Sequence, residues 1–214
     1  VWARLRHAGV RTSRRRVLRL MREHALLSPS RAGAPRGPRA HDGTIIPATV
    51  DTMWGTDLTT VWTGEGQAAV FVAIDHCSAD CVGIHAALQA NRFEALEPIR
   101  QGVLHHFGSI DRGIARGLAL RHDHGSNFMA DAFQKQAKFW GVAPSYAFVA
   151  EPETNGVIER FFRTLTEQAI HGRIFQTIDD VRDAVRAFAA RYNAEWLVEK
   201  NGYRSPTQMR AAWE

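Results

Sequence analysis

Cysteine is scarce in this chain, which has two, Cys77 and Cys81, among 214 residues. Small disulfide scaffolds need several pairs, so that class is excluded. The C-x3-C spacing leaves a metal site open, but the segment between the two cysteines has the pattern of a turn between apolar strands. That pattern favours two small, buried, reduced thiols.

Long apolar runs are also lacking. No stretch of eighteen apolar residues occurs, which excludes a membrane-spanning helix. The beginning is Arg-rich rather than apolar, so we expect no signal peptide. The chain starts with Val, not Met, and we expect that an upstream part precedes it. The expected compartment is the bacterial cytoplasm, in association with the nucleoid.

Positive charge is concentrated at one end of the chain. Residues 1–41 contain eleven arginines and one acidic residue, Glu23, which gives +10. The whole chain carries +5, so the remainder carries −5. A basic arm joined to a mildly acidic domain is typical of a segment that binds a polyanion. A solvated charged face is the alternative, and we expect nucleic-acid contact.

Residues 1–27 are predicted to form two short helices across a turn, where Thr12 or Ser13 can cap the second helix. This pattern is typical of a helix-turn-helix, in which the second helix contacts DNA. By itself it is weakly specific, because many small helix pairs bind no DNA. Contacts to phosphates, which set affinity rather than sequence, are expected from Arg14, Arg15, Arg16 and Arg19.

Residues 28–47 are rich in Pro, Gly, Ser and Arg and lack periodicity, which predicts a linker. Residues 48–214 have the pattern of one α/β domain with C-terminal helices. Strands are expected at 49–62, 68–74, 81–87, 117–122 and 143–148, and helices at 92–106, 126–140 and 153–171. Further helices are expected to start at caps formed by Thr177 and Ser205.

The order of these elements predicts the fold class. A three-strand meander that leads into βα units indicates a mixed five-stranded sheet with helices on its faces. This order matches the ribonuclease-H-like fold. We expect inward-facing apolar residues along the helices, including Phe93 and Leu104 on the first and Met129 on the second.

Three acidic residues lie at positions that are typical of catalytic residues. Asp57 lies inside the first strand, where a buried carboxylate is costly unless it binds a cation or a hydrogen-bond donor. Asp123 ends the fourth strand, and ligands gather beyond strand ends in such sheets. Glu159 shares an exposed face of the long helix with Asn155 and Arg163, at i, i+4 spacing.

Three carboxylates on separate elements suit phosphodiester chemistry. Two Mg²⁺ ions can activate a weak nucleophile and stabilise the leaving oxygen, and such hard cations prefer oxygen ligands. Thirty-five residues separate Asp123 from Glu159. That spacing alone is common by chance, but the strand, strand-end and helix contexts make it specific.

The segments WGTDLT, LRHDHGSNF, PETNGVIERFFRTL and RYNAEW with GYRSPTQ resemble the integrase-core (DDE) transposases of bacterial insertion sequences. Within the retroviral integrase superfamily, the resemblance is to the second reading-frame product of the IS-three family. It spans roughly residues 48–210. The opening segment is similar to the small helical module that precedes that core.

The resemblance implies an activity and its partners. It implies that Asp57, Asp123 and Glu159 form the catalytic triad and bind two Mg²⁺ ions, for which Mn²⁺ can substitute. The reaction would be metal-dependent cleavage at transposon ends, followed by strand transfer. The implied partners are double-stranded DNA of the ends and target, further copies of the chain, and an upstream reading-frame product.

Several other residues near the triad have open roles. We expect DNA contacts from His124, Asn155 and Arg163, while zinc at the H-D-H sequence around Asp123 is an alternative. Family members often carry a second basic residue seven positions after the catalytic Glu, where this chain has Thr166, so binding to the DNA ends is expected to be weaker. Asp75 is expected to form strand-end hydrogen bonds.

Two alternative functions stay open. One is another ribonuclease-H-like nuclease, although those enzymes usually have a fourth acidic ligand. The other is a catalytically silent transposase remnant that binds DNA without cutting it. Such a remnant predicts salt-dependent DNA binding without metal-dependent strand transfer.

Overall fold

The computed structural model describes residues 1–27, 47–146 and 156–213. The chain divides into two compact units, Val1–Asp42 and Gly43–Glu214. Among the described residues, no helix combines the length and the apolar character needed to cross a bilayer. Cys77 and Cys81 are buried free thiols, as predicted.

The first unit contains two helices, α1 (Trp2–His7) and α2 (Arg14–Glu23). The predicted cap at Ser13 is confirmed, because its hydroxyl accepts a hydrogen bond from the Arg16 N–H at 3.2 Å. The Trp2 indole N–H donates to the Thr12 carbonyl at 3.0 Å and so ties α1 to the turn. Within the two helices, Val17 is the residue that is buried.

The second unit is built on a mixed sheet of β1 (Met53–Thr63), β2 (Gly66–Asp75), β3 (Cys81–Ala87), β4 (Ala119–His122) and β5 (Ala143–Tyr146). The strand order is β3-β2-β1-β4-β5. The first three strands are antiparallel, whereas β4 runs parallel to β1 and to β5. The predicted five-stranded mixed sheet is confirmed.

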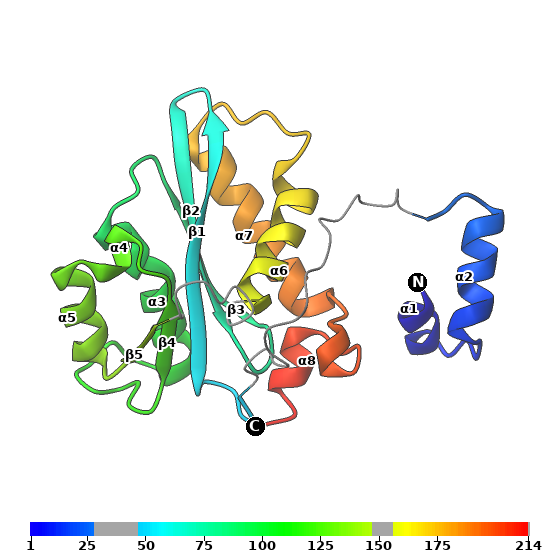
Figure 1. Cartoon of the computed structure of the whole chain (residues 1–214), viewed down its shortest axis with the longest axis horizontal. Helices are drawn as coiled ribbons and strands as arrows, with labels where there is room; N and C mark the ends of the chain where they lie inside the picture. Colours follow the sequence, from blue (N-terminus) through cyan, green and yellow to red (C-terminus); the bar gives the residue numbers. More distant parts are fainter. Residues whose placement is uncertain (28–46, 147–155, 214) are drawn as a thin grey trace, which may run out of the picture. The chain divides into compact units, whose positions relative to one another are not determined.

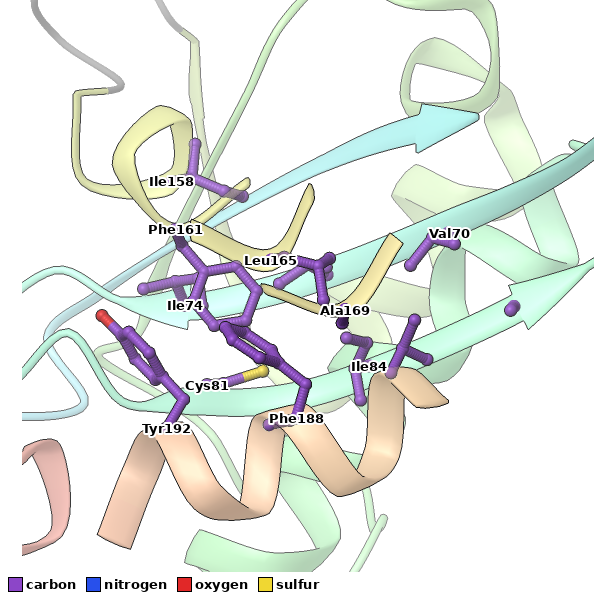
Figure 2. Packing of buried hydrophobic residues seen from close by; sticks show 14 of the residues in the cluster. Val70, Ile74, Cys81, Ile84, Ile158, Phe161, Leu165, Ala169, Phe188 and Tyr192 are labelled. Atoms are coloured by element: carbon purple, nitrogen blue, oxygen red, sulfur yellow. The ribbon is translucent and has the colours of Figure 1, made fainter. Parts of the chain in front are cut away.

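Helices cover both faces of this sheet (Figure 1). One face packs against α3 (Arg92–Phe107), α4 (Ser126–Met129) and α5 (Asp131–Trp140), with Trp54 and Phe133 in the core. The other packs against α6 (Gly156–Leu165), the π-helical turn η2 (Thr166–Ile170) and α7 (Ile178–Glu195). Figure 2 shows the rings of Phe161, Phe188 and Tyr192 gathered between these helices and the sheet.

Two short elements complete the unit, η3 (Glu199–Asn201) and α8 (Pro206–Arg210). The predicted caps at Thr177 and Ser205 are confirmed, and both form capping boxes. Arg210, on α8, donates to the carboxylate of Asp51 at 2.6 and 3.1 Å and to that of Asp80 at 3.0 Å. This buried cation therefore ties α8 to the start of β1 and to the β2–β3 turn.

Asp75 forms strand-end hydrogen bonds, as predicted. Its carboxylate accepts from the Asp51 N–H at 2.9 Å and from both the N–H and the hydroxyl of Ser78, at 2.6 and 2.7 Å. The carboxylate thus holds the turn after β2 against the segment before β1.

Some predicted elements differ in the structure. The single helix expected at 126–140 is two helices, because Ala130 is extended, with φ −63° and ψ 135°. The long helix is described from Gly156 and becomes π-helical at Thr166; residues 153–155 lie outside the described residues. The fifth strand is described as far as Tyr146.

Three apolar residues predicted to face inward are exposed. Phe93 is 61%, Leu104 45% and Met129 42% exposed. The Arg92 guanidinium lies 4.9 Å from the centroid of the Phe93 ring, in the first turn of α3. Leu104 follows buried Val103, so it lies about 100° further around the helix and outside the apolar stripe.

The outer edge of β3 is bonded to side chains from two helices. Asn193 of α7 accepts from the Cys81 N–H and donates to the Cys81 carbonyl, both at 2.9 Å. Gln101 of α3 accepts from the Ile84 N–H at 3.1 Å. Arg182 of α7 donates to the carbonyl of residue 86 at 2.9 Å.

Candidate active site

Asp57 lies at the centre of the sheet and faces α6. It is paired with Val72 on β2, and Val72 belongs to the core beneath α6 and α7; opposite residues in a ladder point to the same face. Its Oδ1 accepts from the Leu58 N–H at 2.8 Å. The pKa of Asp57 is raised to about 6, mainly by burial; the hydrogen bond from Leu58 lowers it, and the Asp123 and Glu159 carboxylates raise it.

Asp123 follows the last residue of β4 and is exposed. Its Oδ1 accepts from the Gly125 N–H at 2.9 Å. A Cβ atom at position 125 would lie 2.8 Å from that oxygen, so any other residue there would push the Asp123 carboxylate out of this position. The chain then enters α4 at Ser126.

Glu159 lies in the first turn of α6 and is exposed. Ile158, Phe161 and Leu165 anchor the opposite face of the helix in the core. A carboxylate in the first helical turn interacts favourably with the helix dipole. The helix therefore holds Glu159 on its exposed side, four residues before Arg163, as the sequence spacing indicated.

The three carboxylates come from β1, the end of β4 and α6, and both partners act electrostatically on Asp57. Within residues 1–27, 47–146 and 156–213, no three His, Cys, Asp or Glu side chains are arranged to hold an ion as they stand. The donors nevertheless fit Mg²⁺ or Mn²⁺ in kind, since all are hard oxygen ligands. A cation would also relieve the repulsion that raises the pKa of Asp57.

The residues predicted to contact DNA lie in different parts of the chain. His124 and Arg163 are exposed in the second unit, and Asn155 lies outside the described residues. Four predicted residues lie on α2 in the first unit, where all are exposed: Arg14, Arg15, Arg16 and Arg19. Exposure leaves these side chains accessible to phosphates.

Two residues near the site were not singled out from the sequence. Arg121 is buried on β4, between Gly55 and Ser145 in the register, and its guanidinium donates to the Ser145 hydroxyl at 3.3 and 3.4 Å. Its position two residues before Asp123 on one strand could have indicated a shared face. Gln134 on α5 contacts His122, a pairing for which the sequence holds no local signal.

His122 is 1% exposed. Its ring lies 5.7 Å from that of Phe128 and 5.9 Å from that of Phe133. Burial lowers the pKa of His122. The His122 ring therefore packs against aromatic rings of α4 and α5.

Comparisons with known proteins agree with this architecture. Two family models, both described as "Integrase core domain", match residues 47–152 and 140–206. Transposase InsD for insertion element IS2A/D/F/H/I/K of Escherichia coli is 28% identical over 221 residues, which cover 97% of this chain and 71% of the relative.

Solved structures share the fold at low sequence identity. A chain of the simian T-cell lymphotropic virus intasome, in complex with PP2A regulatory subunit B56 gamma, aligns with a TM-score of 0.64 at 14% identity; the match covers 83% of this chain and 60% of the viral chain. The HTLV-2 integrase catalytic core domain in complex with magnesium, in its trimeric form, aligns at 0.57 and 15% identity, over 76% of this chain and 98% of that one.

The predicted ribonuclease-H-like fold and the predicted resemblance to integrase-core transposases are thus confirmed. The two family models together span residues 47–206, which is most of the chain. The chain therefore belongs to the integrase core domain family.

Proposed function

We propose that this chain is the catalytic part of a transposase, which cleaves DNA at transposon ends and joins the freed 3′-OH to another strand. Asp57, Asp123 and Glu159 are the proposed metal ligands. One observation carries the proposal: the carboxylates of Asp123, at the end of β4, and Glu159, on α6, both raise the pKa of Asp57 on β1, in a fold shared with integrases.

The protein's own groups prepare this site. The Leu58 N–H orients one oxygen of Asp57, and the Gly125 N–H orients one oxygen of Asp123. Glu159 is carried by a helix whose opposite face is buried. Two divalent cations, when bound, would activate the attacking oxygen and stabilise the leaving oxygen.

The proposed cofactor is a pair of Mg²⁺ ions. The HTLV-2 integrase core, which has the same fold, forms a complex with magnesium, and the donor set here is of the same hard-oxygen class. Mn²⁺ is expected to substitute, because it also favours carboxylate and water ligands.

The proposed partners are double-stranded DNA and further copies of the chain. Exposed arginines on α2 would contact phosphates, and His124 and Arg163 would do so beside the triad; Asn155 is proposed on its sequence position. The intasome relative and the dimeric and trimeric HTLV-2 cores support assembly of several copies. An upstream reading-frame partner and association with the nucleoid are proposed from the family resemblance.

The test is strand transfer by the full chain with labelled duplex ends of its own element and Mg²⁺ or Mn²⁺. Asp57→Asn, Asp123→Asn and Glu159→Gln are each expected to abolish strand transfer, because each removes a proposed metal ligand. DNA binding in EDTA should be unchanged. Wild-type-like joining by any one variant would remove that residue from the triad.

A catalytically silent DNA-binding remnant is the second candidate. It is favoured by the lack, among the described residues, of three side chains arranged to hold an ion. In that case the wild-type protein would bind DNA but form no joined product with either metal. Cleavage of an RNA–DNA hybrid in preference to transposon ends would instead indicate another ribonuclease-H-like nuclease.

A further inference from the structure

Gln134, on α5, connects the two ends of the Asp123 loop, which is the turn after β4 together with the first residues of α4 (residues 123–128). Its side-chain nitrogen donates to the Phe128 carbonyl at 2.7 Å and lies 3.2 Å from Nε2 of His122. On the other side of the imidazole ring, Nδ1 lies 2.7 Å from the Asp123 carbonyl oxygen. A chain of contacts thus runs from α5 to the backbone of Asp123.

The donors and acceptors in this series of contacts are mutually consistent. The Asp123 carbonyl can only accept, so Nδ1 of His122 carries a hydrogen. Nε2 can then accept one hydrogen of the Gln134 amide, while the second goes to the Phe128 carbonyl. Both hydrogens of the amide therefore have an acceptor, and the ring is fixed in one tautomer.

These contacts hold both ends of a short loop. The His122 ring holds the backbone at Asp123, and the Gln134 amide holds it at Phe128. Inside the loop, the Gly125 N–H holds the Asp123 carboxylate. The orientation of that carboxylate therefore depends on a loop whose two ends are tied to α5.

We infer that Gln134 is a positioning residue, which fixes the loop from Asp123 to Phe128 so that the Asp123 carboxylate is held ready to bind a divalent cation. The role in catalysis rests on the proposed function, whereas the ordering of the loop does not. Partners that orient metal ligands in this way commonly change metal affinity or activity by about 10- to 100-fold when they are removed.

The first experiment measures hydrogen–deuterium exchange in the full chain without metal. Gln134→Met keeps the length of the side chain but removes both hydrogen bonds. Gln136→Met is the matched control, because it makes the same change on α5 at a side chain outside this chain of contacts. We expect exchange at residues 123–129 to become about tenfold faster in Gln134→Met, on the scale of one or two lost hydrogen bonds, and to be unchanged in the control.

The second experiment measures how strand transfer depends on Mg²⁺ concentration. Gln134→Met is expected to raise the concentration needed for half-maximal rate by about tenfold, with unchanged DNA affinity in EDTA. Gln134→Glu keeps the shape of the side chain but places an acceptor against the Phe128 carbonyl. It should also raise the Mg²⁺ concentration needed for half-maximal rate, and it replaces the Met variant in this test if that variant does not fold.

The outcomes separate this inference from the proposed function. Unchanged exchange at 123–129, or faster exchange spread over the whole second unit, would overturn the positioning role. Local loosening with an unchanged Mg²⁺ dependence would overturn the link to Asp123. A wild-type protein that transfers no strands, in which Gln134→Met still loosens the loop locally, would refute the proposed function and leave the ordering of the loop supported.

Discussion

The carboxyl group of Asp57 ionises at a higher pH in the folded, metal-free protein than in the unfolded chain. Its pKa is raised from 3.8 to about 6, mainly by burial. Between those pH values the folded protein keeps a proton that the unfolded chain releases. The stability contributed by this group is therefore fully present below pH 3.8 and is lost as the pH rises through about 6.

Replacing Asp57 by Asn should consequently stabilise the metal-free protein at neutral pH while removing a proposed ligand. We expect a gain of about 1–2 kcal/mol at pH 8 after allowance for partial exposure, or about 2–8 °C in Tm. Thermal melts in EDTA at pH 4 and pH 8 test this. The gain should be present at pH 8 and nearly absent at pH 4, and Asp111→Asn, at an exposed carboxylate, should show no such difference.

The sequence indicated the three carboxylates but not the groups that orient them. Asp57, Asp123 and Glu159 stand in recognisable local contexts, a strand, a strand end and a helix. Gln134 reaches His122 across twelve positions through the packing of α5 on the sheet. Contacts of this kind depend on tertiary structure, so no local pattern predicts them.

Elements were predicted best where their pattern was local. The strand at 81–87 is confirmed to the residue, and the Thr177 capping box marks the start of α7. The break between α4 and α5 was missed because no Gly or Pro interrupts that segment. Phe128 and Phe133 are buried on both sides of the break, so the apolar positions alone do not show that one helix has become two.

Arg210 connects elements that are distant in sequence, and its removal should be costly. Its side chain is 10% exposed and contacts Asp80, which is 8% exposed, as well as Asp51. Arg210→Met would leave two carboxylates without their cation in a poorly solvated place. Breaking a buried pair in this way typically costs about 3–5 kcal/mol, which corresponds to a fall in Tm of about 6–20 °C.

Thermal melts of the metal-free chain at pH 7.5 measure this loss. Arg191→Met is the matched control, because Arg191 is exposed on α7 and should shift Tm by less than about 2 °C. A variant at Arg210 that melts like the control would show that α8 is held by its other contacts.

At the scale of the whole molecule, charge is divided between the two units. The arginines of α2 lie on the surface of the first unit. Each arginine that neutralises a phosphate contributes about 0.9 to the slope of log K against log salt concentration. Replacing Arg14, Arg15, Arg16 and Arg19 together by Gln should therefore lower the magnitude of that slope by about 3–4.

Fluorescence anisotropy with a duplex transposon end at several NaCl concentrations measures the slope. Arg186→Gln with Arg191→Gln, at two exposed arginines of α7, is the control for a general loss of charge. An unchanged slope in the α2 variant would show that this helix does not lie on the DNA backbone.

The bonded outer edge of β3 has a consequence for self-association during protein production. Unpaired edge strands act as templates for a strand from another chain, which is a common route to aggregation. Here Asn193, Gln101 and Arg182 already hydrogen-bond to four backbone groups along that edge. An incoming strand would first have to displace these side chains. The edge is therefore protected against aggregation by strand addition at high protein concentration.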